Sequence, residues 1–388
     1  YYKAVVSPPE KLELWAAFMT AFANFLVDRY GADEVCTWYF EVWNEPDLRQ
    51  PIVGGFWSGT IDEYFAMYAV TATALKSVHG GCLRVGGPAT SNTVKWIAPF
   101  LNYTDARNVP VDFISAHAYP SGNDRDALTN IVAQAVAVAD EQNLPFVLSE
   151  FNSGLGLFCC HDTEYAAAFL AYTAVRMQQQ QQQQQRRWRR QRQQKHRYLP
   201  LGMSYWTFSD IFEEMHSVQD NVNVRSPFHN AYGLISVDGI PKPSFRAFEL
   251  LRRMPNATLP VRAMTRPTHD NWVSLVAGMP DRRAHKMNLM LVSFAPAPSW
   301  GAVETWNVSI SVTDLFIVGN VDVVVDALVY RVDEIHANAW TEWKRMGSPG
   351  RAHVNSSVIA ALNASSALVG EPQECRVDGA GADASVEL

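Results

Sequence analysis

The order of apolar and polar positions predicts alternating helices and short buried strands over the first 255 residues. In residues 10–30, large apolar side chains recur at the spacing of one helix face: Leu14, Phe18, Phe22, Phe25 and Leu26. Residues 36–42 instead form an aromatic and β-branched run, which is typical of a strand buried on both faces. The same patterns predict helices at 61–78, 93–102, 126–142, 163–177 and 245–253, and strands at 83–88, 111–120, 144–150 and 201–208.

Strands that alternate with helices in this way predict a parallel sheet and an α/β fold of the TIM (β/α)8 barrel type. Polar residues directly follow several of the strands, as active-site residues do at one end of such a barrel. The pattern contains five strand–helix units, whereas a closed barrel has eight. Because the chain begins with Tyr1 and not with Met, we expect the first three units to lie upstream of Tyr1. Otherwise the chain is not a complete catalytic domain.

The pattern changes after residue 255. Short strands without intervening helices are predicted at 272–277, 287–294, 307–312 and 321–329. This succession is typical of a β-sandwich. We therefore divide the chain into a partial barrel at 1–255, a β-sandwich accessory domain at 256–370 and a tail at 371–388. The tail is rich in acidic and small residues and is expected to be loose.

A low-complexity segment at 178–197 interrupts the barrel pattern. Eight consecutive glutamines precede an arginine-rich stretch at 186–190. Polar tracts of this kind cannot bury a core, so we expect disorder here. An inserted solvated loop or a gene-model error is favoured over the alternative, a basic interaction arm.

The most informative stretch is 40–47, where an apolar run meets carboxylates, an amide and a proline. Pro46 ends the strand because it lacks an N–H and restricts the residue before it. Glu45 is therefore expected at the strand end, where Trp43 would partly desolvate it, raise its pKa and keep it protonated as a general acid. Asn44 offers a donor and an acceptor to a substrate hydroxyl. The alternative is an ordinary strand-to-loop turn with exposed acids.

A second carboxyl group follows the same design. The apolar run at 144–148 leads to Glu150, and a polar, glycine-containing loop comes next. Alone, Glu150 would also be consistent with a structural acid. Two carboxyl groups at two strand ends are the requirement for glycoside hydrolysis, in which one protonates the leaving oxygen and the other attacks or activates water.

Composition narrows the class of protein. The chain has 388 residues, 48% of them hydrophobic, and a net charge of -7, so it lacks the basic footprint of a nucleic-acid partner. Twelve tryptophans suit a carbohydrate partner, because the apolar faces of sugars stack on aromatic rings, although tryptophan also fills large cores. No run of about 18 apolar residues exists, so no membrane span is expected.

The cysteines and the glycosylation sequons indicate the cellular compartment in which the protein is expected. The five cysteines are an odd number without metal-ligand spacing, which favours one or two disulfides and no zinc site. Five N-x-S/T sequons indicate a secreted or lysosomal protein of the secretory pathway: Asn102, Asn256, Asn307, Asn355 and Asn363. The sequence leaves the oligomeric state open.

From about residue 12 to residue 251 the chain resembles glycoside hydrolase family 39, the β-xylosidase and α-L-iduronidase family. The motifs that carry this resemblance are FEVWNEP at 40–46, RVGGP at 84–88, HAYP at 117–120, SEFNS at 149–153, HDT at 161–163, SYWTFSD at 204–210 and IPKP at 240–243. The resemblance implies a TIM barrel with an accessory β-domain, and hydrolysis that retains the anomeric configuration without a metal or cofactor.

The same resemblance assigns roles to the two carboxyl groups. Glu45 matches the acid/base at the end of the fourth barrel strand, and Glu150 matches the nucleophile at the end of the seventh. This assignment agrees with the count of units, since strands one to three would precede Tyr1. Retention predicts a separation of about 5 to 5.5 Å between the two carboxyl groups.

Further residues are expected to bind the sugar. By resemblance, Asn44 contacts the hydroxyl next to the anomeric carbon, and Trp206 is the stacking platform. His117 and Tyr119 are two apart on a strand and would point together into the barrel mouth. A lone histidine on an apolar strand is more often a core residue, but the His-x-Tyr match favours a role in the site.

Glu213 and Glu214 match the acidic pair that holds sugar hydroxyls in the β-xylosidase branch; without the resemblance they would be interpreted as solvated loop charges. This pair would repel a uronic acid, which needs nearby cations. The leading hypothesis is therefore a retaining glycosidase for terminal β-xylosides or related glycosides. The alternatives are α-L-iduronidase-like hydrolysis of glycosaminoglycans and a catalytically inactive carbohydrate-binding barrel.

Overall fold

A computed structural model of the chain describes residues 6–48, 55–91, 95–120, 124–155, 160–191, 199–211, 226–255, 273–281, 286–295, 325–378 and 385–387. Its helices are α1 (Leu12–Tyr30), α2 (Ala32–Val35), α3 (Ile61–Lys76), α4 (Ile97–Ala106), α5 (Ala127–Glu141), α6 (Glu164–Gln191), α8 (Pro243–Arg253), α9 (Ala339–Arg345) and α10 (Ser356–Ser365), with short 3-10 turns η1 (His79–Gly81) and η2 (Arg351–His353). Its strands are β1 (Tyr39–Glu41), β2 (Arg84–Thr90), β3 (Phe113–Ala118), β4 (Phe146–Phe151), β5 (Gly202–Tyr205), β6 (Val273–Asp281), β7 (Lys286–Ser293), β8 (Val325–Tyr330), β9 (Gly370–Asp378) and β10 (Ser385–Glu387).

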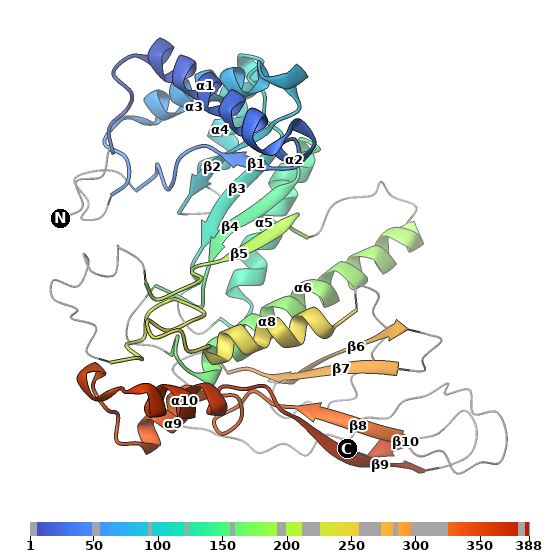
Figure 1. Ribbon diagram of the computed structural model, residues 1–388. Helices are drawn as coiled ribbons and strands as arrows, with labels where there is room; N and C mark the ends of the chain where they lie inside the picture. Colours follow the sequence, from blue (N-terminus) through green and yellow to red (C-terminus); the bar gives the residue numbers. More distant parts are fainter. Residues whose placement is uncertain are drawn as a thin grey trace.

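The centre of the fold is a parallel sheet in the order β1-β2-β3-β4-β5, so neighbouring strands also follow one another in sequence (Figure 1). All its pairings are parallel, and each connection contains helical residues, as βαβ units require. The α/β expectation is confirmed to this extent, as five strands of a barrel-like sheet. The three units expected upstream of Tyr1 stay a prediction.

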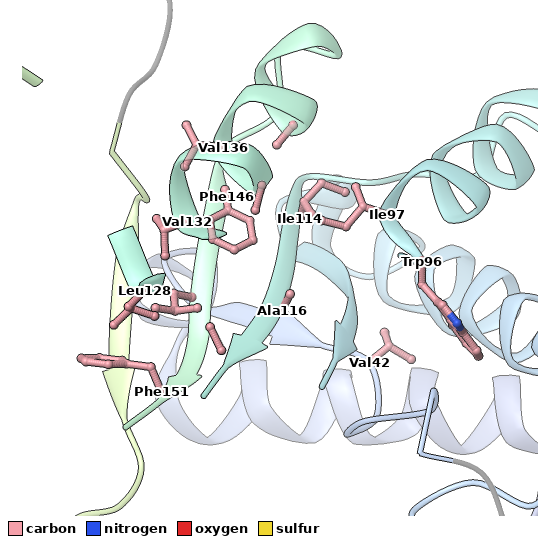
Figure 2. Packing of buried hydrophobic residues seen from close by; sticks show 14 of the residues in the cluster. Val42, Trp96, Ile97, Ile114, Ala116, Leu128, Val132, Val136, Phe146 and Phe151 are labelled. Atoms are coloured by element: carbon pink, nitrogen blue, oxygen red, sulfur yellow. The ribbon is translucent and has the colours of Figure 1, made fainter. Parts of the chain in front are cut away.

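Helix α5 packs against one face of this sheet. The side chains of Leu128, Val132 and Val136 recur every four residues on α5 and lie towards the apolar residues of the sheet (Figure 2). The strands contribute Ile114 from β3 and Phe146 from β4, both at most 1% exposed. Burial of these side chains is what holds α5 against the sheet, because apolar area removed from water contributes about 25 cal/mol per Å2.

Strand β1 differs from the expectation of burial on both faces. It lies at one edge of the sheet, and Tyr39 is 43% exposed because no described strand pairs with its other side. A disulfide between Cys36 and Cys82 links the segments that lead into β1 and β2, which confirms the expectation of a disulfide. Helix α1 is present as predicted and contacts α3, where Trp15 Nε1 donates to Thr71 Oγ1 over 2.7 Å.

The glutamine tract was expected to be disordered, and this is wrong for its first part. Helix α6 continues from Glu164 through the glutamines to Gln191. Its first half is anchored by buried side chains, among them Leu170 and Val175. Because this half supplies the helical nucleus and glutamine is a good helix former, each further residue extends the helix at little cost.

The C-terminal region contains three of the predicted strands, β6, β7 and β8, within two antiparallel sheets. Strands β6 and β7 form a hairpin, and β8, β9 and β10 form a second sheet in the order β10-β9-β8. The strand expected at 307–312 lies outside the described residues. Helices α9 and α10 stand where no helix was predicted; their only local signals are the capping side chains of Asn338 and Asn355. The β-sandwich arrangement stays a prediction.

The tail at 371–388 was expected to be loose, and this is wrong where the chain is described. Strand β9 pairs with β8 from Gly370 to Cys375, and β10 pairs with the end of β9. Main-chain hydrogen bonds make these pairings, so the polar side chains of the tail do not prevent them. Among the described helices, none combines the length and the apolar composition that a membrane crossing requires.

Candidate active site

Three of the strand ends, those of β1, β3 and β4, bring together four of the residues singled out in the sequence. His117 lies near the end of β3, directly opposite Glu150 on β4 in the parallel register. Tyr119 follows β3, and Glu45 follows β1 by four residues. Because the carboxyl ends of parallel strands meet at the same edge of a sheet, these side chains converge there.

Glu45 is held on an irregular turn. It has a φ of 44°, and Trp43 has a φ of 70°, so both occupy the left-handed region that non-glycine residues rarely adopt. The backbone N–H of Glu45 donates to the Ala89 carbonyl over 2.9 Å, which fixes the turn to the end of β2. Trp43 donates from Nε1 to the Phe56 carbonyl and meets the Trp57 ring edge-on at 5.2 Å between centroids. The turn carries Glu45 into a position where only 7% of the residue is exposed.

Two further contacts secure this turn. The hydroxyl of Tyr64 lies 3.0 Å from the Val42 carbonyl and 3.1 Å from the Pro88 carbonyl, so it bridges the ends of β1 and β2. Burial, together with neighbouring charges, raises the pKa of Tyr64 well above its ordinary value, so the hydroxyl remains a donor. Asp47 accepts from both the backbone and the hydroxyl of Ser91, over 2.8 Å and 2.7 Å.

The two carboxyl groups meet around one imidazole. Nδ1 of His117 lies 2.9 Å from Oε1 of Glu45 and 3.4 Å from Oε2 of Glu150. The hydroxyl of Tyr119 donates to Oε1 of Glu150. Strands β1 and β4 would be roughly 14 Å apart in a flat sheet, so the curl of the sheet and the reach of the turn after β1 together bring the carboxyl groups close.

The protonation of the two partner residues follows from these contacts. Burial alone would lower the pKa of His117, but the hydrogen bond to Glu45 and the charge of Glu150 outweigh burial and raise that pKa. His117 therefore holds a positive charge between the carboxylates up to a higher pH than an ordinary histidine. Burial and the charge of Glu150 raise the pKa of Tyr119 far above its ordinary value, which keeps Tyr119 a hydrogen-bond donor.

The remaining predicted site residues fall into two groups. Asn44 is exposed beside Glu45, and Trp206 is half-buried directly after β5, with its N–H bonded to the Phe151 carbonyl over 2.9 Å. Both therefore border the cluster. Glu213 and Glu214 lie outside the residues that the structure describes.

Three residues near this cluster were not predicted individually. Asn152, fully buried, donates to the carbonyls of Trp206 and Tyr232 and accepts from the Tyr205 hydroxyl. The His161 ring packs against the Tyr232 ring, with 4.8 Å between centroids. Asn152 and His161 stand inside motifs noted in the sequence, which was the available signal.

Donor atoms of Glu45, His117 and Glu150 all lie within 4.8 Å of one another. An imidazole and two carboxylates form a set that several divalent metals accept. The same three groups also suit acid–base and nucleophilic work, because a second carboxylate and an imidazole stand within reach of each carboxyl group. A curled parallel sheet with such a pair of carboxyl groups at its carboxyl edge is typical of a glycosidase.

Comparison with known proteins agrees with this class. The sequence model of the glycosyl hydrolases family 39 matches residues 1–366, and the chain belongs to this family. The chain is 33% identical to a β-xylosidase of Caldicellulosiruptor saccharolyticus over 384 residues, which are 95% of this chain and 69% of that protein. It is 29% identical to a β-xylosidase of Geobacillus stearothermophilus over 380 residues, 90% of this chain and 64% of that protein.

A solved structure extends the likeness to the fold. The chain resembles the crystal structure of a monomeric β-xylosidase from Caulobacter crescentus, with a TM-score of 0.69 and 25% sequence identity. The match covers 100% of this chain and 74% of that one. The chain thus spans about two thirds to three quarters of the length of these three relatives.

Proposed function

We propose that the protein is a retaining glycosidase that removes terminal β-xylosyl residues through a covalent glycosyl-enzyme. The observation that carries this proposal is the separation of the two carboxyl groups. One oxygen of Glu45 lies within 4.8 Å of one oxygen of Glu150. Retaining glycosidases separate their carboxyl groups by about 5 to 5.5 Å, whereas inverting enzymes need about 6.5 to 9.5 Å to admit a water molecule.

In the first step, Glu150 is the nucleophile and Glu45 the acid. A carboxylate oxygen of Glu150 attacks the anomeric carbon while Glu45 gives its proton to the glycosidic oxygen, and the bond to the leaving group breaks. Tyr119, which donates to Oε1 of Glu150, orients the carboxylate for this attack. The product of the step is an ester between the sugar and Glu150, with Glu45 ionised.

In the second step, Glu45 is the base. It takes a proton from water as the water oxygen attacks the anomeric carbon, and the ester bond to Glu150 breaks. Two inversions give net retention, so the sugar leaves as the β-anomer. His117, which contacts both carboxyl groups through Nδ1, holds them beside each other through both steps.

The choice of a β-xyloside rests on the similar proteins. Two of them are named β-xylosidases and match at least 90% of this chain. The sequence adds the acidic Glu213–Glu214 pair, which suits neutral sugar hydroxyls and would repel a uronic acid.

Product stereochemistry tests the mechanism. An aryl β-xyloside is hydrolysed inside an NMR tube, and the anomeric proton of the first-formed xylose is followed before mutarotation. We expect the β-anomer to appear first, and the Glu150→Gln protein, prepared in parallel, to release none. First appearance of the α-anomer would contradict retention. Turnover of an aryl α-L-iduronide without turnover of the xyloside would contradict the proposed substrate.

A further inference from the structure

Three motifs that take no part in the chemistry above meet at one buried cation. Lys242 precedes α8, Asp162 precedes α6, and Asp210 follows β5. Nζ of Lys242 lies 2.5 Å from Oδ1 of Asp162 and 2.7 Å from Oδ2 of Asp210. Lys242 is fully buried, and the two aspartates are at most 2% exposed. The HDT, SYWTFSD and IPKP motifs thus each contribute one member of a single ion cluster.

A contribution to stability is a weak explanation for a buried ion cluster of this kind. The cost of desolvating buried charges can exceed the attraction between them. Burial alone would lower the pKa of Lys242, but the charges of Asp162 and Asp210 outweigh burial and raise that pKa. The lysine therefore stays charged although its ammonium group is desolvated. We expect such a charge to hold neighbouring backbone in position.

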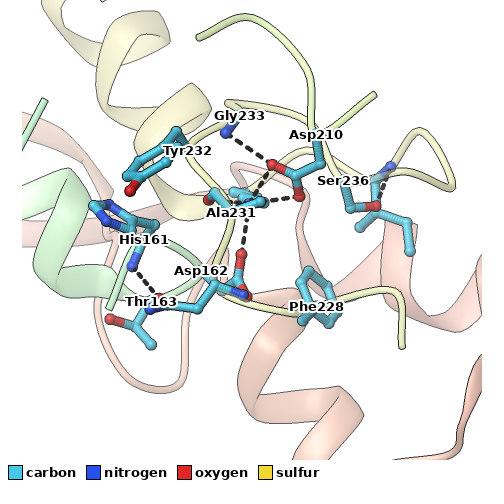
Figure 3. Close-up of polar contacts among 12 residues, drawn as sticks. His161, Asp162, Thr163, Asp210, Phe228, Ala231, Tyr232, Gly233 and Ser236 are labelled. Atoms are coloured by element: carbon cyan, nitrogen blue, oxygen red, sulfur yellow. Dashed lines mark hydrogen bonds and ion pairs between the residues drawn. The ribbon is translucent and has the colours of Figure 1, made fainter. Parts of the chain in front are cut away.

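The cluster holds one segment of backbone, residues 230–233 (Figure 3). Asp162 accepts from the N–H of Asn230 over 2.5 Å, Lys242 donates to the carbonyl of Ala231 over 2.9 Å, and Asp210 accepts from the N–H of Gly233 over 2.8 Å. Three of the four residues are thus fixed by charged groups, and charge-assisted hydrogen bonds are about twice as strong as neutral ones.

The fourth residue of the segment, Tyr232, contacts residues beside the active site. Its ring packs against His161, as Figure 3 shows, and its carbonyl accepts from the N–H of Thr207 over 3.0 Å. The same carbonyl accepts from Nδ2 of Asn152 over 3.4 Å. Asn152 stands two residues after Glu150, so the segment leads directly to the strand end that carries this carboxylate.

We propose that Lys242 is a positioning residue of the active site. With Asp162 and Asp210 it fixes residues 230–233, and through Tyr232 and Asn152 it holds the strand ends that carry Glu150 and Trp206. The role of Lys242 in catalysis rests on the proposed function, whereas its role in fixing these strand ends does not.

The test uses the Lys242→Met/Asp210→Asn double variant. It removes the cation and one anion together, so the net charge of the cluster stays the same. Leu75→Ala is the matched control for lost stability, because Leu75 is 1% exposed and lies on α3, a helix that contributes no member of the ion cluster. Both proteins and the wild type are compared at a temperature where all are folded.

Two measurements are made on each protein. The first is amide hydrogen exchange in peptides that cover 226–234 and 202–208. We expect exchange at least tenfold faster in both peptides of the double variant, since the N–H of Thr207 bonds to the carbonyl of Tyr232. The second is steady-state hydrolysis of an aryl β-xyloside. We expect kcat to fall roughly 10- to 100-fold in the double variant, the effect of misplacing a reacting group by about 1 Å. The control should change neither by more than about twofold.

Three outcomes would overturn the inference: faster exchange in 226–234 alone, wild-type kcat despite faster exchange in both peptides, or an equal fall of kcat in the control. If the double variant does not fold, Asp210→Asn alone is expected to move both peptides and kcat in the same direction by less, and no movement would count against the inference. If the wild type does not hydrolyse the xyloside, the proposed function fails, and the exchange comparison of the two peptides still decides whether Lys242 fixes these strand ends.

Discussion

The two carboxyl groups of the site are held by different kinds of backbone structure. Glu150 stands inside strand β4, in register with His117 on the neighbouring strand. Glu45 stands outside β1 on a turn with positive φ values at two residues, and several side chains that contact no substrate in the proposed mechanism hold this turn. The proposed nucleophile is thus fixed by the sheet itself, and the proposed acid/base by side chains that hold its turn.

The contrast agrees with what each group does in the proposed mechanism. A nucleophile must keep one line of attack, and parallel strand pairing provides that rigidity. An acid that later becomes a base must reach over the sugar to the leaving oxygen, so it needs a turn that leaves the plane of the strands. Strained turns persist only when their surroundings hold them. We therefore expect substitutions that affect the turn and substitutions that affect the strand to differ in their effects on activity and stability.

The largest expected effects come from the carboxyl groups themselves. Glu150→Gln should lower kcat by about 10^4-fold or more on every xyloside, because no ester can form. Glu45→Gln should lower it by about 10^2- to 10^4-fold on xylosides with poor leaving groups, and much less where the leaving group needs no proton. Steady-state rates over a series of aryl leaving groups measure this. Equal losses for both variants across the series would contradict the two roles.

The hydroxyl partners give a smaller, matched comparison. Tyr119→Phe removes the donor to Glu150 and should lower kcat by roughly 10^2-fold with little change in stability. Tyr64→Phe leaves two strand-end carbonyls without their buried donor and should lower the free energy of unfolding by about 1 to 3 kcal/mol. Urea unfolding and kinetics on both proteins are the measurements. A loss of unfolding free energy in Tyr119→Phe but not in Tyr64→Phe would contradict this expectation.

The disulfide lies on the side of the sheet that carries the proposed acid/base, where it links the segments that lead into β1 and β2. The closed loop spans a sequence separation of 46 residues. The chain-entropy model gives a loss of about 4 kcal/mol in unfolding free energy for the Cys36→Ser/Cys82→Ser protein. Thermal and denaturant unfolding of the oxidised and reduced wild type provide the control. Unchanged unfolding on reduction would show that the link does not constrain the unfolded chain.

The smallest effect concerns pH on the nucleophile side. Burial, reinforced by the charge of Asp162, outweighs Lys242 and raises the pKa of Asp210 from 3.8 to about 6. The folded protein therefore binds a proton that the unfolded chain releases, so this contribution to stability is present below pH 3.8 and is lost as the pH rises to about 6. Asp210→Asn should remove that downward slope from the unfolding free energy. An identical slope in both proteins between these pH values would exclude Asp210 as its source.

Much of this arrangement could be predicted from local sequence. Helical spacing located α3 and α5, continuous apolar runs located β3 and β4, and the motifs located Glu45 and Glu150. These signals are local because side-chain periodicity and the residues at strand ends are visible in neighbouring positions of the sequence.

The rest depends on contacts between distant positions. Nothing near Glu45 in sequence indicates that its turn has positive φ values or that Tyr64, 22 residues beyond Val42, holds it. The link from Asn152 to Tyr232 spans 80 positions. The continuation of α6 through the glutamines was missed for a different reason: composition predicts what a tract does alone, not what an anchored helix before it imposes.

The most direct test of the central claim, that Glu150 is the nucleophile of a retaining enzyme, is covalent trapping. The protein is incubated with 2-deoxy-2-fluoro-β-xylosyl fluoride, whose fluorine slows the second step, and is then analysed by intact mass and peptide mapping. We predict one adduct per chain, on the peptide that contains Glu150, and none on the Glu150→Gln protein. An adduct on Glu45, or none on folded protein that still hydrolyses aryl β-xylosides, would contradict the account.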